Sequence, residues 1–208
     1  MTQEKVLQQG AEAVILLSGD SVIKRRVRKR YRLPEIDEEI RKLRTRSEGK
    51  LLAKAGKEIP VPRVKEVDET KKEIVMDFIQ GEKLSDFLDS FPLEKQEEIC
   101  MKVGQEIARL HDSDMIHGDL TTSNMILVGK KGAKVFFIDF GLGFHSHKIE
   151  DKAVDLHLLK EALEARHFRH WQVLFEKVKK GYAGSKNAPA VLEQLKKVEA
   201  RGRYKESY

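Results

Sequence analysis

The sequence predicts an α+β fold in which a strand-rich first part is followed by a helical second part. Short apolar runs separated by turn residues fill the first 80 residues, whereas apolar residues at three- and four-residue spacing dominate after Gly81. A hydrophobic content of 40% over 208 residues supports a buried core. We therefore expect a single domain of two lobes: an N-lobe over 1–80, a C-lobe over 81–200, and a basic C-terminal tail over 201–208.

The expected N-lobe consists of five strands and one main helix. Strands at 6–7, 13–17 and 21–27 are separated by Gly10 and by a turn at 18–20. A helix over 34–57 begins at Pro34 and ends at Gly56. Strands at 64–67 and 73–79 complete the lobe. The helix should face the sheet with an apolar stripe made of Ile36, Ile40, Leu43, Leu51, Leu52 and Ala55.

The expected C-lobe is mostly helical. An amphipathic helix over 94–111 is followed by two short strands on either side of 129–132. Helices over 150–166, 170–182 and 189–200 complete the chain.

One line of sequence points to chemistry. The run I-H-G-D-L-T-T-S-N at 116–124 places Asp119 five residues before Asn124, and I-D-F-G at 138–141 places Asp139 fifteen residues further on. This H-x-D-x-x-x-x-N … D-F-G arrangement is typical of kinases. Phosphoryl transfer needs a carboxylate beside the attacking oxygen, for which Asp119 is the candidate, and oxygen ligands for Mg²⁺, for which Asn124 and Asp139 are candidates. The sequence therefore predicts a minimal two-lobe protein-kinase-like fold that uses ATP and Mg²⁺.

A kinase also needs a lysine on the third strand and a helical glutamate that holds it. Lys24 lies in the third expected strand, and Glu48 lies four residues before Leu52, on the face of the helix expected to be buried. Both are therefore candidate catalytic residues. Glu38 and Glu39 remain alternatives to Glu48 nearer the start of the helix.

The other ATP contacts follow from the order of the elements. The loop at 9–13 has one glycine where the usual glycine-rich loop has three, and residues 76–79 should form the hinge whose backbone reads adenine. The candidates are Gln9, Gly10, Ala11, Val14, Val22, Met76, Asp77, Ile79 and Ile126.

The second half of the chain departs from ordinary protein kinases. Gly118 replaces the arginine of H-R-D, and Thr121 stands where a lysine is usual. Asp155 comes only sixteen positions after Asp139, and no A-P-E follows, so a platform for docking peptides is not expected. Asp155 is the candidate for a helix carboxylate that braces the catalytic loop. Ser146, in the short segment after D-F-G, is a candidate autophosphorylation site.

These residues resemble the PRPK family, the small atypical kinase subunit of the KEOPS complex, and more distantly the RIO kinases. The matching segments are QGAEA at 9–13, VIK at 22–24, KRYR at 29–32, RTR at 44–46, HGDLTTSN at 117–124, DFGL at 139–142, EDK at 150–152 and RGR at 201–203. The resemblance implies ATP hydrolysis, Ser/Thr kinase activity on limited targets, and support for threonylcarbamoylation of tRNA by a partner transferase. The implied partners are that transferase subunit, a small adaptor subunit and tRNA.

The charge distribution fits an anionic partner. Net charge is +6, and seven of the nine residues from 24 to 32 are Lys or Arg. A solvated charged face is the ordinary explanation for such a run; with the resemblance, contact with tRNA phosphates becomes the preferred hypothesis. The candidate contacts are Arg28, Lys29, Arg30, Arg201 and Arg203.

The single cysteine, Cys100, favours a reducing compartment, and no run is long and apolar enough for a bilayer span. We expect a cytoplasmic location, also nuclear in a eukaryote, and no membrane association. Two alternatives to the tRNA-modification role stay open. One is a free-standing Ser/Thr or small-molecule kinase of the aminoglycoside-phosphotransferase type. The other is a binding module whose nucleotide site serves only stability.

Overall fold

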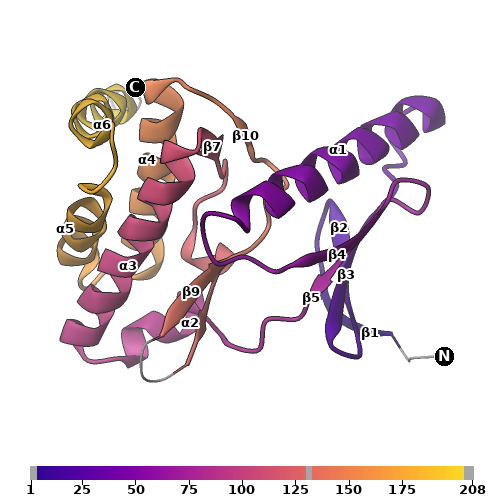
Figure 1. Cartoon of the computed structure of the whole chain (residues 1–208), viewed down its shortest axis with the longest axis horizontal. Helices are drawn as coiled ribbons and strands as arrows, with labels where there is room; N and C mark the ends of the chain where they lie inside the picture. Colours follow the sequence, from indigo (N-terminus) through magenta and orange to yellow (C-terminus); the bar gives the residue numbers. More distant parts are fainter. Residues whose placement is uncertain (1–3, 130–132, 204–208) are drawn as a thin grey trace. The chain divides into compact units, whose positions relative to one another are not determined.

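The computed structural model describes residues 4–129 and 133–203 (Figure 1). It divides into two compact units. The first runs up to Gln80, except for Glu58–Pro60, which belong with the second unit that begins at Gly81. Of the tail expected over 201–208, the structure describes only the last turn of a helix that ends at Arg203; residues 204–208 lie outside the described residues.

The first unit contains a five-stranded antiparallel sheet. Its strands are β1 (Lys5–Gln9), β2 (Ala13–Ser18), β3 (Ser21–Arg26), β4 (Val64–Asp68) and β5 (Glu73–Asp77), in the order β1-β2-β3-β5-β4. The β2–β3 hairpin closes through two residues, the first of which is Gly19 with φ 61°. Such two-residue turns need a positive φ at that position, which glycine adopts without strain. This turn fixes the register that places Lys24 opposite Ile15 and Ile74.

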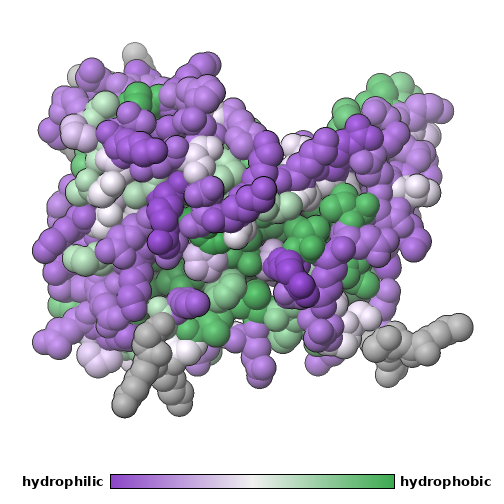
Figure 2. Space-filling view, viewed as in Figure 1, coloured by the Kyte–Doolittle hydropathy of each residue, from purple (hydrophilic) through white to green (hydrophobic). Residues whose placement is uncertain are grey.

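Helix α1 (Pro34–Ala55) packs against this sheet, but only its second half does so through apolar side chains. Leu51, Leu52 and Ala55 are buried as expected. The expectation for the first half of the stripe is wrong, because Ile36 and Leu43 are 52% and 51% exposed. Apolar atoms accordingly emerge over the N-terminal end of α1 in the space-filling view (Figure 2).

Polar residues anchor the first half of α1 instead. Asp37 is fully buried and accepts hydrogen bonds from the backbone of Lys29 and from Arg41. Buried carboxylates require such partners, because an unpaired charge inside a protein is costly. The side that α1 buries near its start is therefore set by ion pairs, which apolar periodicity does not reveal.

The second unit combines four long helices with two small sheets. The helices are α3 (Leu93–Asp112), α4 (Ile149–Arg166), α5 (Trp171–Tyr182) and α6 (Ala188–Arg203). Strands β6 (Glu82–Lys83), β8 (Met125–Val128) and β9 (Lys134–Phe137) form one sheet, and β7 (Met115–Ile116) pairs with β10 (Phe144–His145) in the other. Short helical turns α2 (Leu84–Phe87), η1 (Leu88–Ser90) and η2 (Thr122–Asn124) link them. The sequence does not predict β6, β7, β10, α2 or the two 3₁₀ turns.

The expected turn between β8 and β9 falls largely on 130–132, which lie outside the described residues. The long helices begin or end within about three residues of the expected positions, an ordinary uncertainty at frayed helix ends.

Helices α3 and α5 approach each other closely through two glycines. A Cβ added to Gly104 would lie 2.0 Å from the carbonyl oxygen of Val178, and one added to Gly181 would lie 2.1 Å from that of Met101. The contact buries Ile107, Val178 and other apolar side chains almost completely. Among the described residues, no helix has the length and hydropathy needed to span a membrane.

Candidate active site

The first unit contains a buried ion pair between β3 and α1. Lys24 Nζ lies 2.6 Å from Glu48 Oε1, and the two side chains are 8% and 2% exposed. The pairing therefore agrees with the expectation from helix geometry. Glu38 does not compete for Lys24, since it pairs with Lys72 at 2.6 Å and its side chain is 63% exposed. Glu39 is exposed as well.

A second cation shares the same carboxylate. Arg26 Nη2 lies 2.5 Å from Glu48 Oε2, and Arg26 is 6% exposed. Because strand side chains alternate between faces, residues 24 and 26 point to the same side of β3. Arg26 is not among the residues expected from the sequence, although its spacing of two residues from Lys24 on one strand is a signal that finds it. Glu48 is thus held from two directions on one face of the sheet.

The strand register corrects one of the expected ATP contacts. Val14 lies opposite Arg25, so it faces the side of the sheet away from Lys24. Ile15 lies opposite Lys24, and Val22 pairs with Met76, which puts these residues on the same face as Lys24. A one-residue difference reverses the face of a strand residue. Ile15 therefore replaces Val14 as the β2 residue beside Lys24.

Two backbone N–H groups of the expected hinge already donate hydrogen bonds within the first unit. The N–H of Asp77 donates to Arg63 O at 3.0 Å, and that of Phe78 donates to Asp20 O at 2.9 Å. Asp77 also pairs through its side chain with Arg63 and Lys65. The Asp77 N–H is consequently not a donor for adenine, which corrects that part of the prediction. The role expected for Ile79 stays a prediction.

The expected phosphate-covering loop lies between β1 and β2. Gln9 ends β1, and the N–H of Gly10 donates to Ala13 O at 2.9 Å, closing a tight turn. Gln9, Gly10 and Ala11 are all exposed. A Cβ on Gly10 would approach Ala13 O only to 3.4 Å, an ordinary contact. Nothing within the first unit therefore demands glycine at position 10.

The second unit holds Asp119 and Asn124 together. The Asn124 side-chain amide donates to the Asp119 carboxylate at 2.8 Å and to the Asp119 carbonyl at 3.0 Å. Since the amide nitrogen is used in these bonds, the amide oxygen remains the group that Asn124 can offer to a cation. The spacing of five residues thus serves one compact loop built around η2.

Asp155 braces this loop from α4. Its carboxylate accepts hydrogen bonds from the N–H of His117 at 2.8 Å and from the N–H of Gly118 at 2.9 Å, and it contacts His111 Nε2 at 3.1 Å. Asp155 is 1% exposed. The expected bracing contact is present, with two backbone N–H groups as its targets.

The remaining His111 nitrogen, Nδ1, lies 3.0 Å from the hydroxyl of Tyr182 on α5. His111 therefore links the brace to the helical core, a contact that the sequence analysis missed. His167 is a similar case: it is buried, and it contacts Thr122 Oγ1 at 3.1 Å and Asp89 at 2.9 Å. Neither histidine belongs to a recognisable motif, and each meets a partner at least 44 residues away along the chain.

The glycine of H-G-D has a structural cause. Gly118 has φ 78°, and an added Cβ would lie 2.3 Å from the carbonyl oxygen of Leu142. No side chain, and least of all the arginine of ordinary protein kinases, fits there. The segment after D-F-G thus packs directly on the backbone of the catalytic loop.

Asp139 itself has φ 62°, a left-handed conformation that is uncommon for residues other than glycine. Strained backbone of this kind often marks a functional position. The side chain accepts a hydrogen bond from the N–H of Gly141 at 3.1 Å and is exposed.

His117 packs between the catalytic loop and the D-F-G segment. Its ring lies 4.5 Å from the Phe140 ring, centroid to centroid, and Nε2 contacts Ile138 O at 3.1 Å. Burial lowers the pKa of His117 and so favours the neutral ring. A neutral ring that donates from Nε2 can accept the Asp119 N–H at Nδ1, 3.3 Å away.

The donors available in the second unit fit Mg²⁺ held jointly with nucleotide phosphates. Among the described residues, no cluster of three or more His, Cys, Asp or Glu side chains could hold a metal alone. Mg²⁺ in nucleotide sites uses one or two protein ligands plus phosphate oxygens and water. Asn124 and Asp139 supply an amide oxygen and a carboxylate of that kind. Ile126 lies on β8, the strand that begins directly after Asn124, and is partly exposed.

The basic residues expected to contact tRNA have different environments. Arg28 and Arg30 are exposed. Lys29 is not a free surface cation: its side chain is 14% exposed, and it contacts Ala11 and Glu12. Arg201 pairs with Glu150 and is 66% exposed, whereas the side chain of Arg203 lies outside the described residues.

Ser146, the expected autophosphorylation site, donates a hydrogen bond to Asp151 at 2.5 Å and accepts one from the N–H of Lys148. Its hydroxyl therefore helps to order the approach to α4. The autophosphorylation role stays a prediction.

Comparisons with known proteins agree with this geometry. The RIO domain model matches residues 20–160. The KEOPS complex subunit Bud32 of Pyrococcus abyssi is 44% identical, over 97% of each chain. A probable serine/threonine-protein kinase BUD32 homolog of Archaeoglobus fulgidus is 36% identical over 95% of each chain. A probable bifunctional tRNA threonylcarbamoyladenosine biosynthesis protein of Methanobrevibacter smithii is 41% identical, and this chain spans 37% of its length.

Among solved structures, a Rio2 kinase–ADP/Mg²⁺–phosphoaspartate complex from Chaetomium thermophilum matches with a TM-score of 0.63 and 18% identity, covering all of this chain and 72% of that one. At that identity the likeness concerns the fold alone. The fold and the RIO domain match over residues 20–160 define a RIO-type, kinase-like domain. Within that class, the chain belongs to the Bud32 family.

Proposed function

We propose that this chain is a Mg²⁺- and ATP-dependent atypical Ser/Thr kinase and ATPase that supports tRNA threonylcarbamoyladenosine synthesis as a subunit of a KEOPS complex. The names of the relatives support the role, since they include a KEOPS complex subunit and a probable bifunctional tRNA threonylcarbamoyladenosine biosynthesis protein. The proposed partners are the tRNA threonylcarbamoyl transferase subunit, a small adaptor subunit and tRNA.

The observation that carries the enzymatic part is the buried contact of Lys24 and Arg26 with Glu48. Desolvating three charged groups is expensive, and buried ion pairs often contribute little to stability compared with apolar packing. A fold that needed only stability would not require them. Holding a lysine at a fixed place on β3 is, however, what a nucleotide phosphate site requires.

Each residue then has a defined task. Lys24, positioned by Glu48, neutralises charge on the nucleotide phosphates. Asp119, held by the Asn124 amide, orients the attacking hydroxyl or water and accepts its proton. Asn124 and Asp139 offer oxygen atoms to Mg²⁺, which when bound neutralises the charge that develops on the transferred phosphoryl group. Asp155 fixes the backbone from which Asp119 projects.

The short segment after D-F-G favours this role over that of a free-standing protein kinase. Gly118 lies against Leu142, so the arginine that reads a phosphorylated activation loop in other kinases has no room. Helix α4 already begins at Ile149. The nine residues between Asp139 and α4 leave little chain from which to build a peptide-docking platform. Regulation through partner subunits fits such a chain better than regulation through its own phosphorylated loop.

Reconstitution of the tRNA-modifying assembly tests the proposal. We expect tRNA threonylcarbamoyladenosine formation to fall at least about 100-fold when Asp119→Asn or Asp139→Asn replaces the wild-type chain, the usual scale for a lost catalytic group. A matched control is Asp86→Asn, which removes the charge of an exposed carboxylate that contacts Arg166 and the Ser85 hydroxyl on the surface. Full modification by the Asp119→Asn assembly would reject a catalytic role and favour a nucleotide-stabilised binding module.

A further inference from the structure

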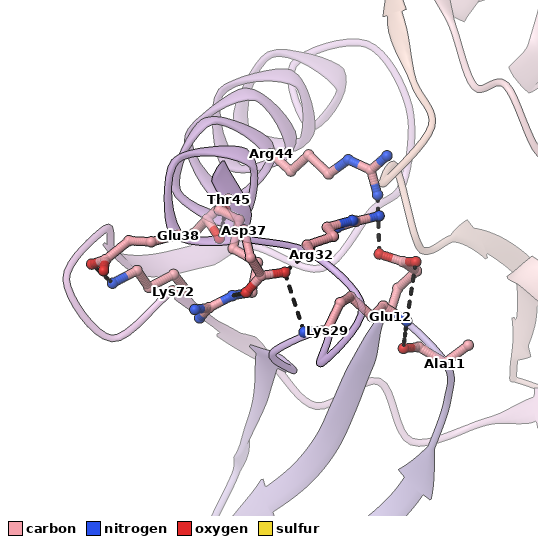
Figure 3. Close-up of polar contacts among 10 residues, drawn as sticks. Ala11, Glu12, Lys29, Arg32, Asp37, Glu38, Arg44, Thr45 and Lys72 are labelled. Atoms are coloured by element: carbon pink, nitrogen blue, oxygen red, sulfur yellow. Dashed lines mark hydrogen bonds and ion pairs between the residues drawn. The ribbon is translucent and has the colours of Figure 1, made fainter. Parts of the chain in front are cut away.

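The loop that connects β1 to β2 has a single glycine, Gly10, yet ion pairs and hydrogen bonds hold it at a defined place. The Lys29 ammonium donates a short hydrogen bond to the carbonyl of Ala11 and lies 3.3 Å from Glu12 Oε1. Arg44, on α1, lies 3.0 Å from Glu12 Oε2. Figure 3 shows Arg44 and Lys29 meeting the loop at Glu12 and Ala11. Lys29, from the segment after β3, and Arg44, from α1, thus hold two consecutive residues of the loop.

Lys29 is itself tied to the start of α1. Its backbone N–H donates to the Asp37 carboxylate at 3.2 Å, and that buried carboxylate is also bound by Arg41 at 2.7 Å. The loop is further paired through its backbone, since Val27 N–H donates to Glu12 O at 3.2 Å. The hydrogen bond to Asp37 consequently holds the Lys29 backbone in place, and with it the point from which the Lys29 side chain extends toward the loop.

The direction of the Ala11 carbonyl has a consequence for anion binding. In a trans peptide the C=O and the following N–H point in opposite directions. A carbonyl that points toward the Lys29 ammonium therefore leaves the Glu12 N–H pointing in the opposite direction, away from Lys29. A backbone N–H held outward in a tight loop is a donor of the kind that binds phosphate.

The same contacts compensate the negative charge of Glu12, which would otherwise repel phosphate. Partial burial raises the pKa of the Glu12 carboxyl, but the hydrogen bond and charge of Lys29 and the charges of Arg44 and Arg32 outweigh this and lower it, so Glu12 is ionised at neutral pH. A bare carboxylate beside a triphosphate would disfavour binding. With two cations within 3.3 Å, its charge is locally compensated.

We propose that Lys29 is a positioning residue for nucleotide binding: it orients the Ala11–Glu12 peptide toward phosphate and, with Arg44, compensates the charge of Glu12. This assignment rests on the proposed function and replaces the expected role of Lys29 as a tRNA contact. In ordinary kinases the further glycines let the backbone of the loop approach phosphate closely. In this chain Lys29 instead fixes the direction of the peptide whose N–H binds the anion.

The test measures binding of Mg²⁺-ATP and of adenosine to the full chain by calorimetry. Lys29→Met should weaken Mg²⁺-ATP about tenfold, the effect of losing one hydrogen bond to phosphate, and should change adenosine affinity less than about twofold. Lys29→Arg should recover much of the loss. Arg30→Met is the matched control, since Arg30 is exposed on the same segment. It should leave both nucleotide affinities unchanged and should weaken tRNA binding, which Lys29→Met should not.

Each other result has a clear meaning. Equal weakening of Mg²⁺-ATP and adenosine by Lys29→Met would show a general structural role and overturn the inference, as would unchanged ATP affinity together with weaker tRNA binding. If Lys29→Met does not fold, Arg44→Met removes the second tie to Glu12 from a partly exposed position and should selectively weaken ATP; unchanged affinity would overturn the charge-compensation role. A wild-type chain that binds no Mg²⁺-ATP would instead reject the proposed function itself.

Discussion

Replacing Asp155 by asparagine removes a charge but keeps the shape of the side chain. The Asp155 carboxylate accepts the N–H groups of His117 and Gly118 on different oxygens, and the oxygen that serves His117 also contacts His111. An asparagine that keeps its oxygen toward His117 must turn its NH₂ toward the N–H of Gly118. The partly buried N–H of Gly118 then loses its acceptor, and the two remaining contacts lose the charge that strengthened them.

The expected cost follows from these three contacts. A buried N–H without a partner costs about 1–3 kcal/mol, and a hydrogen bond to a neutral group is weaker by about 1 kcal/mol than one to a charged group. The sum is about 4 kcal/mol of unfolding free energy, equivalent to a melting temperature lower by about 8–16 °C for a domain of this size.

Thermal and urea unfolding of wild type and Asp155→Asn measure this loss directly. Asp86→Asn serves as the control, because the exposed pair that Asp86 forms with Arg166 is worth less than about 1 kcal/mol. A change of less than about 0.5 kcal/mol in Asp155→Asn would refute the view that this carboxylate holds the catalytic loop.

Three further outcomes follow from the second unit. Gly104→Ala should lower the unfolding free energy by about 1–3 kcal/mol in urea unfolding, because the new methyl group collides with the carbonyl of Val178; an unchanged value would mean that α3 and α5 can separate freely. Burial, with a smaller effect of the Glu97 charge, raises the pKa of Cys100 to about 12. Iodoacetamide at pH 8 should therefore label Cys100 in the denatured chain and not in the native one, which mass spectrometry can show. Burial lowers the pKa of His117, so the unfolded state binds the proton first as the pH falls. Below about pH 6.5, wild-type stability should therefore fall more steeply than that of His117→Gln, by up to about 1.4 kcal/mol per pH unit, and parallel curves would contradict the buried neutral ring.

The motif at 116–124 and 138–141 and the Lys24–Glu48 pair could be predicted from the sequence for physical reasons. Both depend on spacing along one element or on helix periodicity, which local sequence determines. The same holds for Asp155, whose place on a helix close behind D-F-G brings it back to the loop between Ile116 and Asn124.

The errors have a different cause, namely pairing between residues that the apolar period of a single element does not show. Ile36 and Leu43 fit an apolar period but are exposed, because buried Asp37 sets the inner face of that part of α1. Ile15, and not Val14, lies beside Lys24, because the hairpin turn sets a pairing register that differs by one residue from the expected one. Composition likewise cannot tell a paired Lys29 from an exposed Arg30.

The proposed function requires that the chain cleaves the γ-phosphate of ATP through Asp119. The most direct measurement follows γ-labelled phosphate from Mg²⁺-ATP, first with the chain alone and then with the transferase partner and tRNA, with Asp119→Asn in parallel. We predict that label leaves ATP, mostly as free phosphate, at a rate that the partners increase and that Asp119→Asn reduces at least about 100-fold. Equal release by the wild-type and Asp119→Asn chains, with or without partners, would contradict the claim.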